Sequence, residues 1–194
     1  MLAKLFMRLF KILIPLIFLL YSCNEVVENT IKDFLPLDIG KKWYLANDNG
    51  DTLKIEVIDS LDGFYVLLWG GDIRYMKRSD GRVFVRESIY MWESGLKYFL
   101  GVAEFTYIPF PPIEGTSWDE EVSGNNFNFV IKGKVLKYFK KYKIDDSEFD
   151  GVYKIWYKWE KSVGDSLRIV EDTIWVARDI GWIKINKKVL VKYE

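Results

Sequence analysis

The sequence contains no histidine, one cysteine and five prolines in 194 residues. Without histidine there is no Ser-His-Asp triad, no imidazole acid–base chemistry and no histidine metal ligand. A single cysteine excludes an intramolecular disulfide framework and a thiolate zinc cluster. The 28 basic and 28 acidic side chains balance, so the net charge gives no footprint for a nucleic acid partner. We therefore expect no enzymatic activity, no metal and no cofactor.

The composition of the chain is otherwise that of a globular domain. Hydrophobic residues make up 49% of it and charged residues 29%. The first value argues against disorder, and the second argues against a polytopic membrane protein. A length of 194 residues favours a single domain with a sizeable core.

The first 22 residues have the pattern of an export signal. Lys4, Arg8 and Lys11 precede a short apolar run over residues 12–20. As a helix this run rises only about 14 Å, which is too short to cross a hydrocarbon layer of about 30 Å. A basic start, a short apolar core and a small residue before the cleavage point predict a secretory signal peptide.

The apolar run ends in Leu20-Tyr21-Ser22-Cys23, which resembles the lipobox of bacterial lipoproteins. The resemblance implies that Leu20 and Ser22 are recognised during processing and that Cys23 becomes the acylated amino terminus. Two or three acyl chains anchor stably, because each buried methylene contributes about 0.8 kcal/mol. The alternative is an ordinary cleaved signal followed by a free thiol. Since Asn24 is not the aspartate that retains lipoproteins at many inner membranes, the outer membrane is favoured in a two-membrane host.

After the signal peptide (1–22) we expect a polar tether over 23–34 and one β domain over 35–194. Apolar and polar residues alternate with period two through this domain, which is typical of half-buried strands. Turn residues separate the runs at Asn49-Gly50, Asp62-Gly63, Gly70-Gly71, Asp80-Gly81, Ser94-Gly95 and Asp150-Gly151. The pattern predicts an all-β antiparallel meander of about ten to twelve strands, curled into a barrel, a half-barrel or a two-layer sandwich.

One motif occurs twice in the predicted domain. Pro36-x-x-x-Gly40-x-x-Trp43 returns 75 residues later as Pro111-x-x-x-Gly115-x-x-Trp118. The motif suits the entry of a strand, because proline ends earlier pairing, glycine permits the turn and tryptophan starts the strand with a large apolar side chain. It predicts two related halves, 35–108 and 109–194.

Together these residues resemble a group of uncharacterised bacterial lipoproteins. Its members combine a lipobox with a Pro-Leu-x-x-Gly-x-x-Trp entry, often a second entry in mid-chain, and a segment like Ala-x-x-x-Gly-x-x-Lys, which is present here at 177–184. The resemblance implies a cell-envelope location and an all-β fold. It implies no catalytic residues.

Aromatic residues make up 17% of the sequence and include eight tryptophans. Trp156 is the candidate ligand-binding residue, because alternation directs it opposite to Ile155 and Tyr157. Aromatic side chains form platforms for sugars, and an apolar cavity suits acyl chains. The alternative is that these tryptophans only fill a β core.

Three charged clusters have simpler explanations than a binding or catalytic site. Asp146-x-Glu148-x-Asp150-Gly151 is similar to the start of a calcium loop but lacks its terminal acid, so it predicts an acidic solvent loop. The lysine-rich stretch 132–143 fits a solvent-facing strand, with contact to anionic head groups as the alternative. The carboxylates of 119–121 fit a strand exterior better than a glycosidase pair.

We therefore expect a non-enzymatic cell-envelope lipoprotein whose partner is a membrane. Two alternatives remain open, namely a carrier or chaperone for lipids and other hydrophobic ligands on a concave sheet, and a carbohydrate-binding module. A second envelope protein is a further class of partner.

Overall fold

The computed structural model describes residues 34–194 as one antiparallel sheet of twelve strands. The predicted signal peptide, Cys23 and the tether up to residue 33 lie outside the described residues. The strands are β1 (Lys42–Ala46), β2 (Thr52–Leu61), β3 (Phe64–Trp69), β4 (Asp72–Ser79), β5 (Arg82–Glu93), β6 (Leu96–Pro109), β7 (Ser117–Gly124), β8 (Phe127–Ile144), β9 (Ser147–Val163), β10 (Ser166–Ala177), β11 (Gly181–Ile185) and β12 (Lys188–Tyr193). Across 34–194, no helix has the length and apolar character needed to span a membrane.

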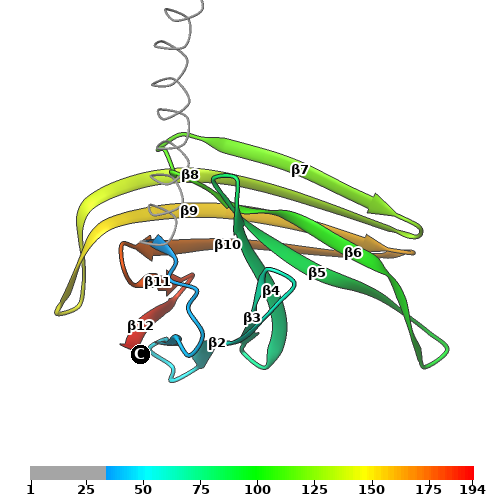
Figure 1. Ribbon diagram of the computed structural model, residues 1–194, viewed down its shortest axis with the longest axis horizontal. Helices are drawn as coiled ribbons and strands as arrows, with labels where there is room; N and C mark the ends of the chain where they lie inside the picture. The colour runs from blue at the N-terminus through cyan, green and yellow to red at the C-terminus, as the bar shows by residue number, and fades with distance from the viewer. Residues whose placement is uncertain (1–33) are drawn as a thin grey trace, which may run out of the picture.

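The strand order in the sheet is β6-β5-β4-β3-β2-β1-β12-β11-β10-β9-β8-β7. The chain runs through six strands to one edge, crosses to the other edge at β7, and returns through six strands until β12 pairs with β1. The sheet curls until its edge strands β6 and β7 approach each other (Figure 1). The all-β meander is confirmed, and of the three predicted architectures the protein adopts a nearly closed barrel.

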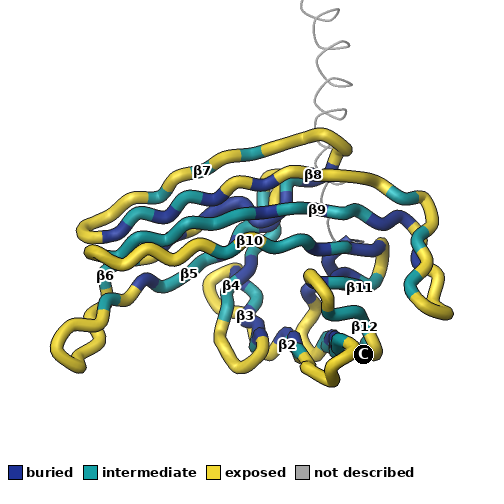
Figure 2. The backbone as a smooth tube through the Cα atoms, turned by 180° about the vertical axis from the view of Figure 1, so that it is seen from behind, coloured by how far each residue is buried: buried dark blue, intermediate teal, exposed yellow. Residues whose placement is uncertain are grey.

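Period-two alternation correctly predicts which side chains fill the barrel. Ile55 and Val57 on β2 are fully buried, and on β8 Phe129 and Ile131 are each 1% exposed. Figure 2 shows the result as buried positions alternating with exposed or half-buried ones along β8 and β9.

One predicted turn is wrong. Asp150-Gly151 lies inside β9, and the β8–β9 hairpin turns instead at Asp145 and Asp146. Asp145 adopts a positive φ of 50°, a conformation that aspartate tolerates better than most residues. Asp145 can therefore make this turn without a glycine. Gly151 lies within the strand instead, with a φ of 59°.

The two copies of the repeated motif form the same local structure. Gly40 and Gly115 have φ values of 92° and 88°, so each uses a backbone conformation that favours glycine. The amide of Gly40 donates to the carbonyl of Val57 at 2.8 Å, and the amide of Gly115 donates to the carbonyl of Val135 at 2.9 Å. Each motif thus fixes a turn before the first strand of its half, β1 or β7.

The tryptophans of the two motifs also occupy equivalent places, because each indole packs against a glycine. Trp43 lies over Gly181, the first residue of β11, and Trp118 lies over Gly133 of β8. A side chain at Gly133 would collide with the Trp118 indole. These glycines are therefore part of the tryptophan packing and not only turn residues.

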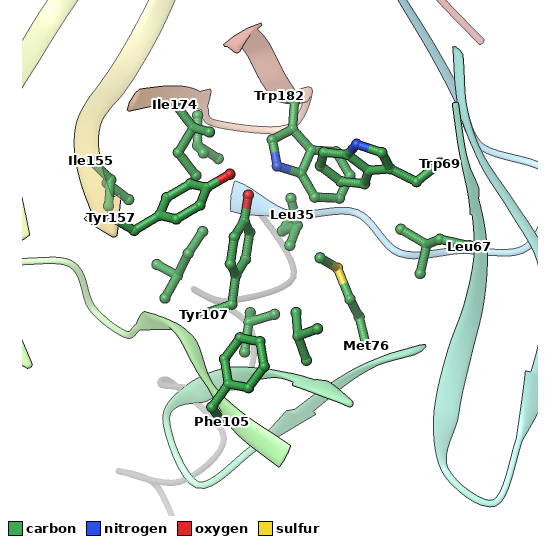
Figure 3. Close-up of a cluster of buried hydrophobic side chains, with 14 of the residues drawn as sticks. Leu35, Leu67, Trp69, Met76, Phe105, Tyr107, Ile155, Tyr157, Ile174 and Trp182 are labelled. Carbon is green, nitrogen blue, oxygen red and sulfur yellow. The ribbon is translucent and has the colours of Figure 1, made fainter. Parts of the chain in front are cut away.

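Residues 34–37 enter the barrel before β1 begins. Phe34, Leu35 and Leu37 are at most 3% exposed. Phe34 meets the ring of Tyr153 on β9 edge-on, at a centroid distance of 5.1 Å. Leu35 lies among the interior side chains of the barrel (Figure 3). Phe34, the last residue of the predicted tether, is thus part of the core.

Candidate functional site

Strands of unequal length leave part of the barrel wall open. β5, β6, β8, β9 and β10 contain 12 to 18 residues, whereas β1 to β4, β11 and β12 contain 5 to 10. β5 pairs with β4 only up to Arg86, and β10 pairs with β11 only from Ile174. The long strands therefore project beyond the short ones (Figure 1).

A cavity of about 600 Å³ lies where the long strands project, between β4, β5, β6, β8, β9 and β10. Its volume falls within the range of small-molecule binding pockets. We call it the mouth cavity. The residues that line it include Asp72, Arg74, Glu87, Phe105, Tyr107, Ile131, Tyr157, Trp159, Arg168, Val170 and Asp172.

The floor of the mouth cavity is apolar and aromatic. Phe105, Tyr107, Ile131 and Tyr157 are each at most 5% exposed. The rings of Tyr107 and Tyr157 meet edge-on at a centroid distance of 5.5 Å, with their hydroxyl groups directed toward the same point in the barrel interior (Figure 3). The floor of the mouth cavity therefore consists mainly of aromatic rings and apolar side chains, with few groups that can hydrogen-bond to water.

The two floor tyrosines differ in how their hydroxyl groups are satisfied. The hydroxyl of Tyr157 donates to Asp172 at 3.1 Å, whereas that of Tyr107 has no hydrogen-bond partner among the described residues. Burial raises the pKa of Tyr107 to about 12, although the nearby Trp182 indole and the positive charge of Arg74 each lower it in part. Burial also raises the pKa of Tyr157 well above its ordinary value. Both phenols stay neutral at physiological pH.

Cationic side chains lie around the entrance of the mouth cavity. The guanidinium of Arg74 lies over Trp69, 4.5 Å from the ring centroid, and that of Arg168 lies over Trp159 at 5.4 Å. The Lys97 ammonium lies 4.0 Å from the centroid of the Tyr90 ring. Among the ion pairs of residues 34–194, none involves Arg74, Arg168 or Lys97.

The carboxylates of the mouth cavity are mostly engaged. Glu87 on β5 accepts from Lys161 on β9 at 2.8 Å, a pair that bridges the two long strands. Asp172 accepts from Tyr157 and from the side-chain amide of Asn186. Asp72, at the start of β4, has no ion-pair partner among the described residues. The cations without a partner outnumber such carboxylates at this entrance.

The strands that project around the entrance carry exposed apolar side chains. On the β5–β6 hairpin Trp92 is 69% exposed. The exposed apolar side chains of this hairpin include Tyr90, Trp92, Leu96, Tyr98 and Phe99. An apolar molecule that approaches this end therefore meets apolar surface before it reaches the mouth cavity.

Trp156, the ligand-binding residue predicted from sequence, lies outside the mouth cavity. It is half-buried on the outer face of β9, and its indole N–H donates to the carboxylate of Glu171 at 2.8 Å. Its neighbours Ile155 and Tyr157 point inward, as the alternation predicted. Leu20, Ser22 and Cys23 lie outside the described residues.

The charged clusters of the sequence are placed as follows. Asp146 of the calcium-like motif lies in the β8–β9 turn, but the rest of the motif belongs to β9, where Glu148 pairs with Lys141 at 2.5 Å, so the predicted acidic loop is limited to the turn. No group of three or more acidic or cysteine side chains within 34–194 is arranged to hold a metal ion. Glu120, from the acidic cluster in β7, contacts the edge strand β6.

Sequence reasoning missed Arg74 and Arg168 as candidate ligand-binding residues. The signal available was a charged residue at an inward position of an alternating strand. Arg74 shares its face of β4 with the buried Met76, and Arg168 shares its face of β10 with the buried Ile174. Because a charge at an inward position is costly to bury, it marks either an ion pair or an opening to solvent.

Comparisons of the chain with protein-family models, with curated proteins and with solved structures found no match.

Proposed function

We propose that this protein is a non-enzymatic cell-envelope lipoprotein, anchored through acylated Cys23, whose barrel binds a small amphipathic molecule in the mouth cavity. The observation that carries the binding function is a cavity of about 600 Å³ with an apolar floor and a charged entrance. The anchor is supported by the sequence Leu20-Tyr21-Ser22-Cys23 and by the resemblance to bacterial lipoproteins described above.

The mouth cavity favours an amphipathic ligand because its two ends differ in polarity. Ile131 and Phe105 at the floor can remove apolar surface from water, at about 25 cal/mol for each Å² buried. Arg168, at the exposed entrance, can keep a polar group hydrated or hydrogen-bonded. A wholly polar ligand would gain nothing from the floor, and a wholly apolar one would strip water from the arginines.

Thermal unfolding with a panel of amphiphiles tests the binding function. At least one amphiphile of neutral, anionic or cationic type should raise the melting temperature of the protein, because a ligand that binds only the folded state stabilises it. Val170→Trp, which fills the half-buried cavity position, should abolish the shift.

Val191→Trp is the matched control, since Val191 is exposed on β12 and does not line the mouth cavity. It should keep the full shift. No shift with any amphiphile, or an equal shift in both variants, would overturn the binding function.

Intact mass spectrometry of protein purified from membranes tests the anchor. The mass should equal residues 23–194 plus a diacylglycerol group and an amino-terminal acyl chain, and Cys23→Ser should abolish the modification. A mature chain with an unmodified Cys23 would refute the anchor and, with it, the expected location at the outer membrane of a two-membrane host.

A further inference from the structure

We infer that the ligand of the mouth cavity is an organic anion, a carboxylate carried on an apolar body, and that Arg74 and Arg168 hold its carboxylate. This inference rests on the proposed function and adds the sign of the ligand's charge and the residues that recognise it. It follows from the charges of the entrance, from the cation–π contacts of the two arginines and from the position of the apolar floor.

The first argument is the state of the charged groups. Arg74 and Arg168 have no ion pair within the described chain. Among the cavity carboxylates, Glu87 is neutralised by Lys161, whereas Asp172 keeps its charge, because its two hydrogen bonds come from the neutral side chains of Tyr157 and Asn186. Asp72 and Asp172 oppose an anion, but Lys97 joins the two arginines, so three cations without an ion pair face two such carboxylates. The unmatched charge at the entrance is therefore positive.

The second argument is that each guanidinium lies over an indole, Arg74 over Trp69 and Arg168 over Trp159, and this cation–π contact holds the side chain in place. Neither guanidinium forms an ion pair with a described carboxylate, so its N–H groups can reach a ligand. Arginine presents these groups as a fork that matches a carboxylate, and such charge-assisted bonds are stronger than neutral ones. The side chains are thus oriented before a ligand arrives, which lowers the entropic cost of binding.

The third argument is the relation of Arg74 to the floor. Arg74 lines the same cavity as the buried rings of Tyr107 and Tyr157, and its positive charge lowers the pKa of both phenols in part. A carboxylate at Arg74 would leave the attached apolar body against Phe105 and Ile131, which are buried and line the cavity. The geometry thus fits a single anionic group with an apolar chain or ring system behind it.

Calorimetric titration with three probes of equal chain length tests the inference. The probes are dodecanoate, 1-dodecanol and dodecylamine, each below its micelle concentration and near neutral pH. Dodecanoate should bind at least about tenfold more tightly than the other two, because only it gains charge-assisted bonds to the arginines. If none of the three binds, the proposed function itself fails. If dodecanol or dodecylamine binds as tightly as dodecanoate, the inference fails while the binding function stands.

Two substitutions locate the carboxylate. Arg74→Gln and Arg168→Gln should each weaken dodecanoate binding by about tenfold and leave dodecanol binding unchanged. Arg168 is exposed, so its variant should keep the melting temperature of the parent protein and stay interpretable even if Arg74→Gln unfolds. Dodecanoate affinity unchanged in Arg168→Gln would overturn the assignment.

Arg178→Gln is the matched control. Arg178 also lies over an aromatic ring, 5.6 Å from the centroid of Phe34, but it does not line the mouth cavity. Its variant should bind dodecanoate as the parent does. An equal loss in Arg178→Gln would show that the effect comes from the overall charge of the protein and not from the cavity arginines.

Discussion

The carboxylate of Glu120 on β7 accepts two hydrogen bonds from Thr106 on β6, one from the main-chain amide at 2.7 Å and one from the hydroxyl at 2.5 Å. The carbonyl of Thr106 accepts a third bond from the Trp118 indole at 3.1 Å. Side chains of β7 therefore hydrogen-bond to main-chain groups at the edge of β6. In a fully closed barrel, a neighbouring strand would form hydrogen bonds to these groups. Covering an edge in this way also prevents pairing with another chain.

Glu120→Ala should lower the free energy of unfolding by about 1–3 kcal/mol, because it leaves the amide and hydroxyl of the buried Thr106 without an acceptor. Urea denaturation measures the change. Glu121→Ala is the control, since Glu121 is exposed and its position on β7 alternates with that of Glu120. Equal stability of the two variants would show that the carboxylate does not hold the two edges together.

Tyr107→Phe should raise the free energy of unfolding by about 1 kcal/mol, because the substitution removes a buried hydroxyl that has no partner. Tyr157→Phe should instead lower it by about 1 kcal/mol, since it removes the bond to Asp172. The same denaturation experiment compares the two tyrosines. A loss of stability in Tyr107→Phe as large as that in Tyr157→Phe would contradict the account of the floor.

The raised pKa of Tyr107 makes stability depend on pH in the alkaline range. With a folded-state pKa of about 12 and an ordinary value of 10.0, the unfolded chain loses its proton first. Ionisation of Tyr107 therefore leaves the free energy of unfolding unchanged below pH 10.0, and about 3 kcal/mol is lost as the pH rises toward 12. Unfolding curves at increasing pH should show this fall.

Tyr107→Phe is the control for the pH dependence and should be less sensitive to alkali than the parent protein. Part of the fall should remain, because the pKa of Tyr157 is also raised by burial. Parallel stability curves for the parent and Tyr107→Phe would mean that the Tyr107 phenol ionises freely in the folded protein.

Gly133→Ala should destabilise the barrel by about 1–3 kcal/mol, since the new methyl group would occupy the place of the Trp118 indole. The indole would have to move and would lose its bond to Thr106. In the double variant with Trp118→Leu the methyl group should cost much less, so the two substitutions should be strongly non-additive. Additive effects on the free energy of unfolding would show that Gly133 is not needed to make room for the Trp118 indole.

Alternation of apolar and polar residues predicted the strands, because successive side chains of a strand point to opposite faces of the sheet. It could not choose between the barrel, the half-barrel and the sandwich. That choice depends on distant parts of the chain, such as Trp43 and Tyr193, whose pairing joins β1 to β12 in the middle of the sheet, and the edge strands β6 and β7, which approach each other. The second copy of the repeated motif lies in the proline-rich crossing from β6 to β7, between the first six strands and the last six.

Less of the candidate site could be predicted from the sequence. The mouth cavity arises from a difference in strand length, and nothing in the local pattern shows where β4 stops pairing with β5. Trp156 was selected for its outward direction, whereas the cavity uses the neighbouring inward positions Tyr157 and Trp159. A charged residue such as Arg74 at an inward position was the one local clue.

Native mass spectrometry of the full-length protein, extracted gently from its membranes, tests ligand binding in the mouth cavity most directly. The account predicts a second species heavier by one small molecule, absent in Val170→Trp and retained in Val191→Trp. Organic extraction of the parent sample should release a molecule with an apolar body and a carboxylate. A single ligand-free species in the parent, or the same bound species in Val170→Trp, would contradict the account.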